Sequence, residues 1–198
     1  DWSSDVCSSD LLTGAADIRP GVKLANRFTP ENKRDARDFV TGELRRLGLA
    51  PERHAYGPDA ENVFALLRSG VPDAEVVVLG AHLDSVRVAP GASDNATGVA
   101  TVLAVTRDAT TVKARTRDLL VVFFDEEERG LVGARQFAER LKTQGARVHS
   151  VHTIDQVGWD KNGNGAIELE LPYTTPAPGA VALYTDAAKA LGLDRKST

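Results

Sequence analysis

The sequence predicts an α/β fold, a three-layer sandwich in which helices cover both faces of a mostly parallel, mixed central sheet. Two largely apolar runs, residues 75–80 and 119–124, have the composition of strands that are buried on both faces of a sheet. Each run precedes a segment whose apolar residues recur with helical spacing, residues 96–108 and 131–144. This alternation of strands and helices favours parallel strands joined by crossover helices.

Local signals predict the remaining elements. A helix is expected to begin at Pro30, because proline fits the first helical turn and Thr29 can cap a free backbone N–H. Gly48 is placed to end this helix. Strands are expected over 52–56, 62–67 and, in the centre of the sheet, 151–157, with a more exposed strand over 167–171 and a last helix over 178–191.

The bulk composition of the 198-residue chain predicts one globular domain. Hydrophobic residues make up 42% and charged residues 26%, which suits a packed core under a polar surface. The net charge is −4 and the basic residues are scattered, so no nucleic-acid-binding surface is indicated. No apolar run reaches the ~20 residues of a membrane span. The single cysteine, Cys7, excludes an internal disulfide and a thiolate zinc site.

The two ends of the sequence differ from the rest. The chain has no methionine, so we do not expect a complete open reading frame with an ordinary start. Residues 1–11 show neither helical nor strand periodicity and resemble translated sequencing-adapter read-through, with a natural Ser/Asp-rich disordered tail as the alternative. Residues 195–198 resemble the start of another such tail. We therefore expect a single, incomplete domain over residues 12–194 between two non-native tails, and a lost signal peptide is compatible with this expectation.

Acidic residues and one histidine follow the predicted strands. His82 and Asp84 come after the first buried run, Glu127 and Glu128 come after the second, and Asp155 lies near the end of the 151–157 strand. Because ligands gather at the carboxyl ends of the strands in such sheets, we expect these side chains to meet at one edge. So many acids in one place would repel each other unless a cation neutralised them.

Each of these residues also has an ordinary structural interpretation. A histidine beside an acid is most often structural, and Asp94, which precedes the 96–108 helix, is in isolation most typical of a helix cap. The four acids 125–128 resemble a solvated face, although they follow six apolar residues. For Asp155 we favour a cation, because an unpaired carboxylate is costly to bury in an apolar strand. Of two adjacent glutamates, one can bind a metal while the other acts as a general base.

Taken together, four segments resemble the M28 family of zinc-dependent aminopeptidases: VVVLGAHLDSV, APGASDNATGVA, VVFFDEEERGLVGA and TIDQVG. The resemblance covers most of residues 30–192. It implies a zinc exopeptidase-like fold with two Zn²⁺ ions, peptide substrates that have a free N-terminus, and an extracellular or periplasmic location. It also implies these roles: His82 and Asp155 bind the first zinc, Asp84 orients His82, Asp94 bridges both ions, Glu128 binds the second, and Glu127 is the general base.

The sequence departs from the family pattern in three places. Ser93 stands where an acid or amide is common, and Gln156 stands where an apolar residue is usual. A later histidine that completes the second metal site is absent, since no histidine follows His152. We therefore expect a complete first site and an incomplete second site, so the chain by itself could be inactive.

Two other functions and a second metal signal stay open. A carboxypeptidase or deacylase would use the same ligands, whereas a non-catalytic binding ectodomain would normally have lost ligands or Glu127. Asp160, Asn162 and Asn164 match the start of a calcium loop, but Leu171 replaces the glutamate expected at its twelfth position. A polar Asn-Gly turn is the alternative to a Ca²⁺ site there. The histidines other than His82 are expected on the surface or in structural positions.

Overall fold

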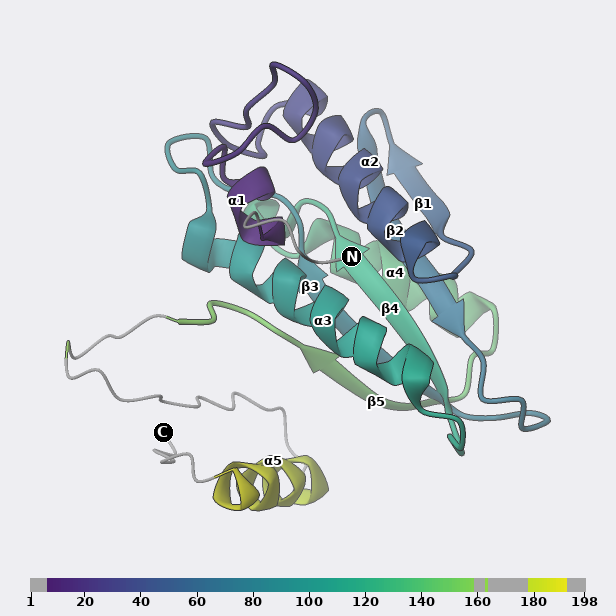
Figure 1. Cartoon of the computed structure of the whole chain (residues 1–198). Coiled ribbons are helices and arrows are strands. Elements are labelled where there is room, and N and C mark those ends of the chain that lie inside the picture. The colour runs from purple at the N-terminus through teal and green to yellow at the C-terminus, as the bar shows by residue number, and fades with distance from the viewer. Residues whose placement is uncertain (1–6, 159–162, 164–177, 192–198) are drawn as a thin grey trace. The chain divides into compact units, whose positions relative to one another are not determined.

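The computed structural model describes residues 7–158, 163 and 178–191. The chain divides into two compact units, Asp1–Val157 and Gly158–Thr198, and α5 (Pro178–Ala190) is the described helix of the second. The first unit (Figure 1) contains the elements α1 (Ser8–Leu12), α2 (Pro30–Arg46), β1 (Glu52–Gly57), β2 (Ala60–Leu67), β3 (Val76–His82), α3 (Thr97–Thr111), β4 (Asp118–Phe124), α4 (Val132–Thr143) and β5 (Val148–Thr153).

The described strands form one mixed sheet in the order β1-β2-β4-β3-β5. β3 runs parallel to both β4 and β5, whereas the β1–β2 and β2–β4 pairs are antiparallel. The β3–β4 register pairs His82 with Phe124, so these two strands end side by side. Their loops therefore leave the sheet at the same edge, and this edge carries the site.

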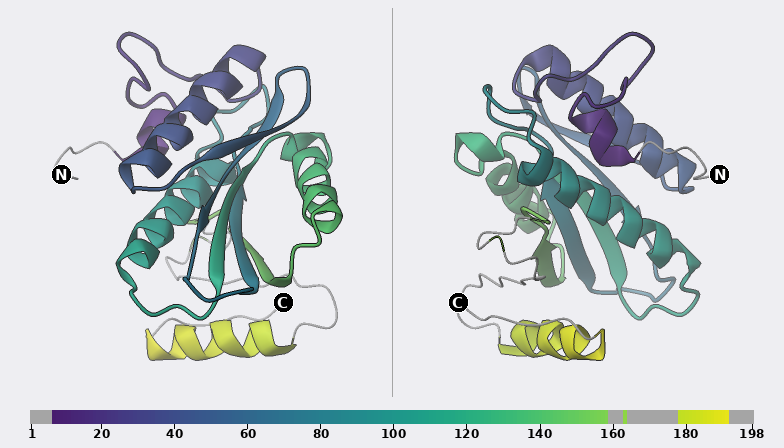
Figure 2. Two further views of the ribbon diagram at one scale, coloured as in Figure 1. Left: turned by 90° about the vertical axis from the view of Figure 1, so that its right-hand side faces the viewer. Right: turned by 60° about the vertical axis from the view of Figure 1, so that its left-hand side comes forward.

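Helices cover both faces of this sheet, which confirms the predicted α/β fold class (Figure 2). Alternate strand residues point to opposite faces, and the two hydrophobic clusters follow this alternation. One cluster joins α2 and α3 to β-strand residues such as Val121 and Phe123. The other joins Phe137 of α4 to residues such as Val122 and Phe124. The two consecutive apolar runs of the sequence are thus buried on both faces, as strands between two helical layers must be.

The last predicted strand of the first unit is displaced. β5 ends at Thr153, not at residue 157, and it lies at one end of the described sheet with Val151 60% exposed. Pairing with β3 stops at Gly80, after which the N–H of Ile154 makes one last bond to the Gly80 carbonyl. Asp155 therefore lies in the following loop with an exposed side chain, and the argument from its burial was wrong. The 167–171 strand and the calcium loop at Asp160, Asn162 and Asn164 lie outside the described residues.

The predicted fold left out residues 1–11, but part of this segment is helical. Ser8–Leu12 forms the short helix α1, and Leu12 is fully buried in the same cluster as α2 and α3. The side chain of Asp10 accepts a hydrogen bond from the Cys7 N–H (3.1 Å) at the start of this helix. Five residues are too few for a sequence period to show, so capping and one buried leucine define this helix. The non-native origin of either end stays a prediction.

The predicted boundaries of α2 are confirmed. Thr29 Oγ1 accepts a hydrogen bond from the Asn32 N–H (3.3 Å), Pro30 is the first helical residue, and Gly48 follows the helix with a φ of +79°. A left-handed residue after the last turn favours glycine, which has no Cβ to clash.

Leu44 of α2 provides a test of the core that lies apart from the site residues. Its side chain is fully buried. We expect Leu44→Ala to lower the free energy of unfolding by about 2–5 kcal/mol, because the substitution removes buried methyl groups and leaves a cavity. Urea unfolding of the metal-free chain measures this loss. A change below ~1 kcal/mol would contradict the packing described for α2.

Candidate metal centre

Three separate segments bring a histidine and two carboxylates together. His82 is the last residue of β3, Asp94 lies in the turn Ala92–Ala96 that leads into α3, and Asp155 follows β5. His82 Nε2 lies 2.9 Å from Asp94 Oδ1 and 3.5 Å from Asp155 Oδ1. One ligand atom from each of the three residues lies within 4.8 Å of the other two. A single cation can therefore contact all three.

The environment of His82 fits a metal ligand. The residue is 5% exposed, and its Nδ1 lies 3.2 Å from the backbone oxygen of Asp84 and 3.6 Å from Asp84 Oδ1. A proton on Nδ1 satisfies this backbone acceptor, which leaves the lone pair of Nε2 directed toward Asp94 and Asp155. Nε2 is buried and has no hydrogen-bond partner of good geometry among the described residues. A buried ring nitrogen that faces two carboxylates would be satisfied by a bound cation, or by a proton when no cation is bound.

The pKa of His82 reflects the negative charge of the surrounding carboxylates. Burial by itself would lower the pKa of the imidazole, but its interactions with Asp155 and Asp84 raise that pKa to about 10. A proton therefore supplies the positive charge that the carboxylates require when no metal is bound. Metal binding would displace this proton, because a ligating imidazole is neutral.

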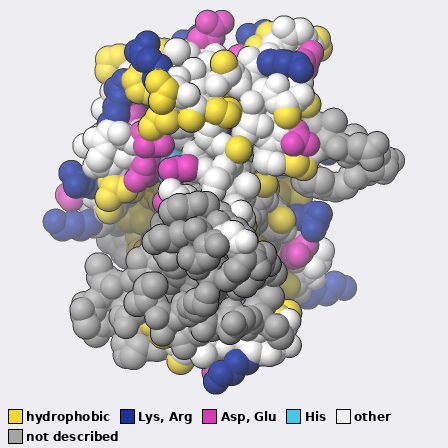
Figure 3. All heavy atoms as spheres, turned by 90° about the vertical axis from the view of Figure 1, so that its left-hand side faces the viewer, with side chains coloured by type: hydrophobic (Ala, Val, Ile, Leu, Met, Phe, Trp, Pro, Cys, Tyr) yellow, Lys and Arg dark blue, Asp and Glu magenta, His cyan; other side chains and the backbone are white. Residues whose placement is uncertain are grey.

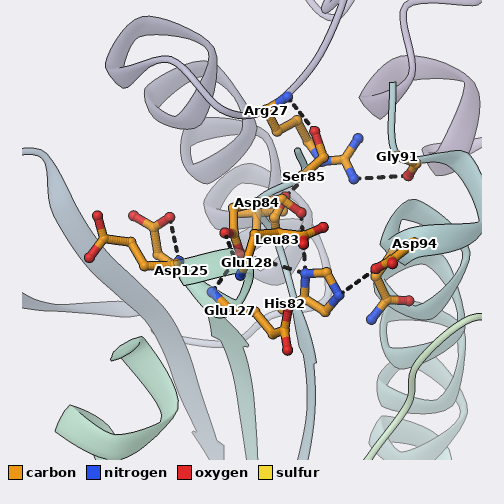
Figure 4. A network of polar contacts seen from close by, with 12 residues as sticks. Arg27, His82, Leu83, Asp84, Ser85, Gly91, Asp94, Asp125, Glu127 and Glu128 are labelled. Atoms are coloured by element: carbon orange, nitrogen blue, oxygen red, sulfur yellow. Dashed lines mark hydrogen bonds and ion pairs between the residues drawn. The ribbon is translucent and has the colours of Figure 1, made fainter. Parts of the chain in front are cut away.

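Asp84 positions the segment that follows β4. Its carboxylate accepts hydrogen bonds from the backbone N–H groups of Glu127 (3.0 Å) and Glu128 (3.2 Å), drawn as dashed lines in Figure 4. The histidine segment and the glutamate segment are thus joined directly. Asp84 was expected to orient His82. In the structure it also holds the backbone of Glu127 and Glu128.

The negative charges of Asp84 and Asp94 act on both Glu127 and Glu128. Burial raises the pKa of Glu127, and the charges of Asp84, Asp155 and Asp94 raise it further while His82 opposes them. Burial raises the pKa of Glu128 too, with Asp94 as the next cause. In Figure 3 acidic side chains gather around a recessed histidine on one face of the molecule. This concentration of negative charge favours a cation in the centre of the group.

The first acid of the 125–128 run has a structural position. Asp125 is buried and pairs with Lys33 Nζ and Arg37 Nη1 of α2, both at 3.0 Å from its Oδ2. Its Oδ1 accepts the N–H of Glu126 (2.9 Å), and Glu126 in turn pairs with Lys33 (3.4 Å) and Arg129 (2.9 Å). The run is therefore neither a solvated face nor a uniform set of ligands, because its first two acids anchor the loop to α2.

Asn95 is a site residue that the sequence analysis missed. It is fully buried, its Nδ2 donates to the backbone oxygen of Ile154 (2.8 Å), and its Oδ1 accepts the Gly98 N–H (3.0 Å). These bonds connect the turn that carries Asp94 to the residue before Asp155. The available signal was an amide directly after a candidate ligand at the start of a helix.

Gly98 makes this connection possible. A Cβ at position 98 would lie 2.1 Å from Asn95 Oδ1 and 2.7 Å from the Ile154 oxygen. We expect Gly98→Ala to weaken zinc binding about 10-fold or more, because disturbing the residues that orient metal ligands typically costs 10–100-fold in affinity. Equilibrium dialysis against zinc measures the effect.

Gly42→Ala in α2 is the matched control for Gly98→Ala, because nothing lies within 4 Å of a Cβ at position 42. We expect Gly42→Ala to keep the zinc affinity of the parent chain. Equal affinities for both variants would show that Asn95 does not control the spacing of Asp94 and Asp155.

A cavity of about 210 Å³ adjoins the candidate metal ligands. His82, Glu127 and Asp155 are among its lining residues, and the rest of the lining is mainly apolar. Phe124, Leu131, Phe137, Leu141 and Ile154 are among the apolar lining residues. A polar cluster beside an apolar hollow is the usual form of a small-molecule or side-chain site.

An α/β sheet that gathers an imidazole and carboxylates at the ends of its parallel strands has the form of a metal-hydrolase site. The chain belongs to peptidase family M28, whose model matches residues 62–192. A probable leucine aminopeptidase of Trichophyton verrucosum is 33% identical over 169 residues, which cover 75% of this chain and 44% of that protein. The chain spans less than half the length of the curated relatives that it matches.

Two aminopeptidases are among the solved structures that are similar to this chain. BSAP, a zinc aminopeptidase from Bacillus subtilis, is 26% identical with a TM-score of 0.62, covering 70% of this chain and 34% of BSAP. The LapA aminopeptidase of Legionella pneumophila has a TM-score of 0.80 at 18% identity, covering 96% of this chain and 54% of LapA. At that identity, the LapA likeness shows the fold alone. Within the part of the chain that the structure describes, no helix has the length and apolar character needed to cross a bilayer.

Proposed function

We propose that this chain carries the metal centre of a zinc-dependent aminopeptidase. The observation that carries the proposal is the convergence of His82, Asp94 and Asp155, whose ligand atoms lie within 4.8 Å of one another around a buried, unsatisfied Nε2. One imidazole and two carboxylates are a donor set that suits zinc. Membership of family M28 and the leucine aminopeptidase relative support peptidase activity.

The candidate ligands divide into two sets. His82, Asp94 and Asp155 would hold the first zinc, and Asp94 with Glu128 would contribute to a second. Asp94 Oδ2 accepts a hydrogen bond from Gln156 Nε2 (3.0 Å), so Asp94 would exchange this amide for a second ion before it bridged the two. When bound, zinc supplies the positive charge that makes water acidic enough to lose a proton near neutral pH.

Glu127 would take the proton from the attacking water. Glu127 lines the same cavity as His82 and Asp155, and its backbone N–H donates to Asp84. Because burial raises its pKa, Glu127 is a stronger base than an ordinary glutamate, and proton transfer is most efficient when this pKa approaches the working pH. The protonated Glu127 can then give the proton to the leaving amine.

The chemistry around the ligands suits a peptide with a free N-terminus. The carboxylates attract an ammonium group, and the apolar cavity can receive an apolar side chain next to it. An extracellular or periplasmic location would suit such an activity. A carboxypeptidase or a deacylase on the same scaffold is the alternative, because either would use the same ligands.

Substrates with free and blocked ends test the proposal. The protein is assayed on three substrates: leucine 4-nitroanilide, N-acetyl-leucine 4-nitroanilide, and an N-blocked peptide with a free carboxyl end. We expect hydrolysis of the free-amine substrate alone, loss of activity with EDTA and recovery with zinc. Cleavage of the N-blocked peptide at its carboxyl end would favour the carboxypeptidase, and removal of the acetyl group would favour the deacylase. Activity that resists EDTA would overturn the metal mechanism.

A further inference from the structure

Arg27 is a fully buried arginine beside the metal centre, in the segment that precedes α2. The hydrogen bonds that its guanidinium makes among the described residues go to backbone oxygens and not to carboxylates. A buried cation without an acidic partner is costly unless its N–H groups are satisfied in another way. Burial lowers the pKa of Arg27 to about 10, while the charges of Asp84, Asp94 and Glu128 oppose this effect, so the side chain stays cationic at neutral pH.

The guanidinium of Arg27 donates to four backbone carbonyls. Nε donates to Leu83 (2.6 Å), Nη1 to Leu12 (2.7 Å) and Pro90 (2.6 Å), and Nη2 to Gly91 (2.9 Å). The Arg27 N–H also donates to Ser85 Oγ (2.9 Å). These bonds satisfy the buried cation through the main chain, and they use the planar fork of donors that is particular to arginine.

Two of these acceptor segments are those that carry metal ligands. Leu83 lies between His82 and Asp84, and Gly91 begins the turn that presents Asp94. Figure 4 shows Arg27 between Ser85 and Gly91, with His82 and Asp94 on the adjacent side of the same segments. The Arg27 side chain therefore connects the histidine segment to the aspartate turn by hydrogen bonds.

Arg27, the Asp94 backbone and Ser85 pack so closely around Gly91 that no larger residue fits there. A Cβ at position 91 would lie 2.6 Å from Arg27 Nη2, 2.6 Å from the Asp94 backbone oxygen and 2.6 Å from Ser85 Cβ. The guanidinium, the Asp94 turn and the Ser85 segment thus converge on one glycine. A shift of Arg27 would move the Gly91 carbonyl and, three residues later, the carboxylate that faces His82.

We propose that Arg27 is a positioning residue of the zinc centre, which sets the spacing of His82 and Asp94 through the Leu83 and Gly91 carbonyls. This inference rests on the proposed zinc site. Lysine cannot substitute, because its single nitrogen has three donors and no fixed fork with which to span four carbonyls. Arg27 acts through the backbone and touches neither the metal nor the substrate.

Arg27→Lys tests the proposal in the 198-residue chain. Zinc affinity is measured by competition with a chromophoric chelator, and the free energy of unfolding is measured without metal. We expect Arg27→Lys to weaken zinc binding about 10–100-fold, the usual effect of changing a residue that orients a metal ligand. Leu44→Ala is the stability control, since it damages the α2 core without touching the site, and we expect it to keep the parent affinity. Equal zinc affinities of Arg27→Lys and Leu44→Ala would overturn the proposal.

A second variant covers the case in which Arg27→Lys does not fold. Gly91→Ala would place a Cβ against Arg27 and Asp94, whereas Gly70→Ala has a comparable positive φ (+83° against +66°) and open space around the Cβ. We expect Gly91→Ala to weaken zinc binding at least ~10-fold relative to Gly70→Ala. Equal affinities for these two variants would overturn the proposal.

Amide hydrogen exchange of the metal-free chain tests the positioning role of Arg27 even if the chain binds no zinc. If the parent chain binds no zinc, the proposed function fails, but exchange in residues 83–96 of the metal-free chain still reports positioning. We expect faster exchange there in Arg27→Lys, or in Gly91→Ala if Arg27→Lys does not fold, than in Leu44→Ala. Equal exchange rates would overturn the positioning role independently of any metal.

Discussion

Glu127→Gln is expected to lower kcat for an N-terminal peptide bond by about 10²–10⁴-fold, the contribution of a well-placed general base. The amide cannot take a proton from the attacking water, whereas its size and its backbone bond to Asp84 are preserved. Zinc affinity should stay near the parent value, because Glu127 does not belong to the group formed by His82, Asp94 and Asp155. Steady-state kinetics and zinc titration of the same preparation measure both quantities.

Glu126→Gln is the matched control for Glu127→Gln. Glu126 is the adjacent glutamate, and its carboxylate pairs with Lys33 and Arg129. We expect this variant to keep kcat within about threefold, because Asp125 still holds the loop on Lys33 and Arg37 and the lost pair with the exposed Arg129 contributes little. Activity of Glu127→Gln within about tenfold of the parent would remove Glu127 from the role of base.

His82→Ala is expected to weaken zinc binding at the first site at least ~100-fold. This exceeds the 10–100-fold effect that is typical when a residue that only orients a ligand is lost. The substitution removes the nitrogen donor and leaves Asp94 and Asp155 facing each other without a neutralising group. Competition with a chelator measures the loss. His149→Ala is the control, because His149 is exposed and its Nδ1 lies 3.4 Å from Glu75. If His82→Ala and His149→Ala bind zinc equally well, His82 is a structural histidine.

The metal-free stability of His82→Ala gives a second readout. The interactions with Asp155 and Asp84 raise the pKa of His82, so the parent gains stability from the imidazolium at neutral pH. We expect His82→Ala to lose this contribution while the sheet stays folded, because His82 is the last residue of β3. Circular dichroism of the variant establishes that a loss of zinc binding is not a loss of fold.

The sequence was sufficient for the sheet and the main helices because their signals are local. Two apolar runs with flanking helical periods define β3, β4, α3 and α4, and Thr29 with Pro30 defines the start of α2. The position of β5 was predicted less well, because its end depends on where pairing with Gly80 of β3 stops. α1 was missed because five residues contain no full period, and its place depends on burial of Leu12.

The sequence indicated the candidate metal ligands because each was expected at the end of a strand or the start of a helix. Their supporting residues were not predicted, because their partners are mostly backbone atoms distant in the sequence. Arg27 contacts the Leu83 carbonyl 56 residues away, and Asn95 contacts the Ile154 carbonyl 59 residues away. A backbone acceptor leaves no residue type in the sequence that could mark the contact. Only the folded chain identifies such partners.

Diffraction at the zinc absorption edge, from crystals of the chain grown with zinc, tests the central claim most directly. The account predicts an anomalous peak about 2.0–2.2 Å from His82 Nε2 and from one carboxylate oxygen each of Asp94 and Asp155. A crystal that holds zinc elsewhere, while His82 Nε2 stays without an ion, would contradict the assignment of this site.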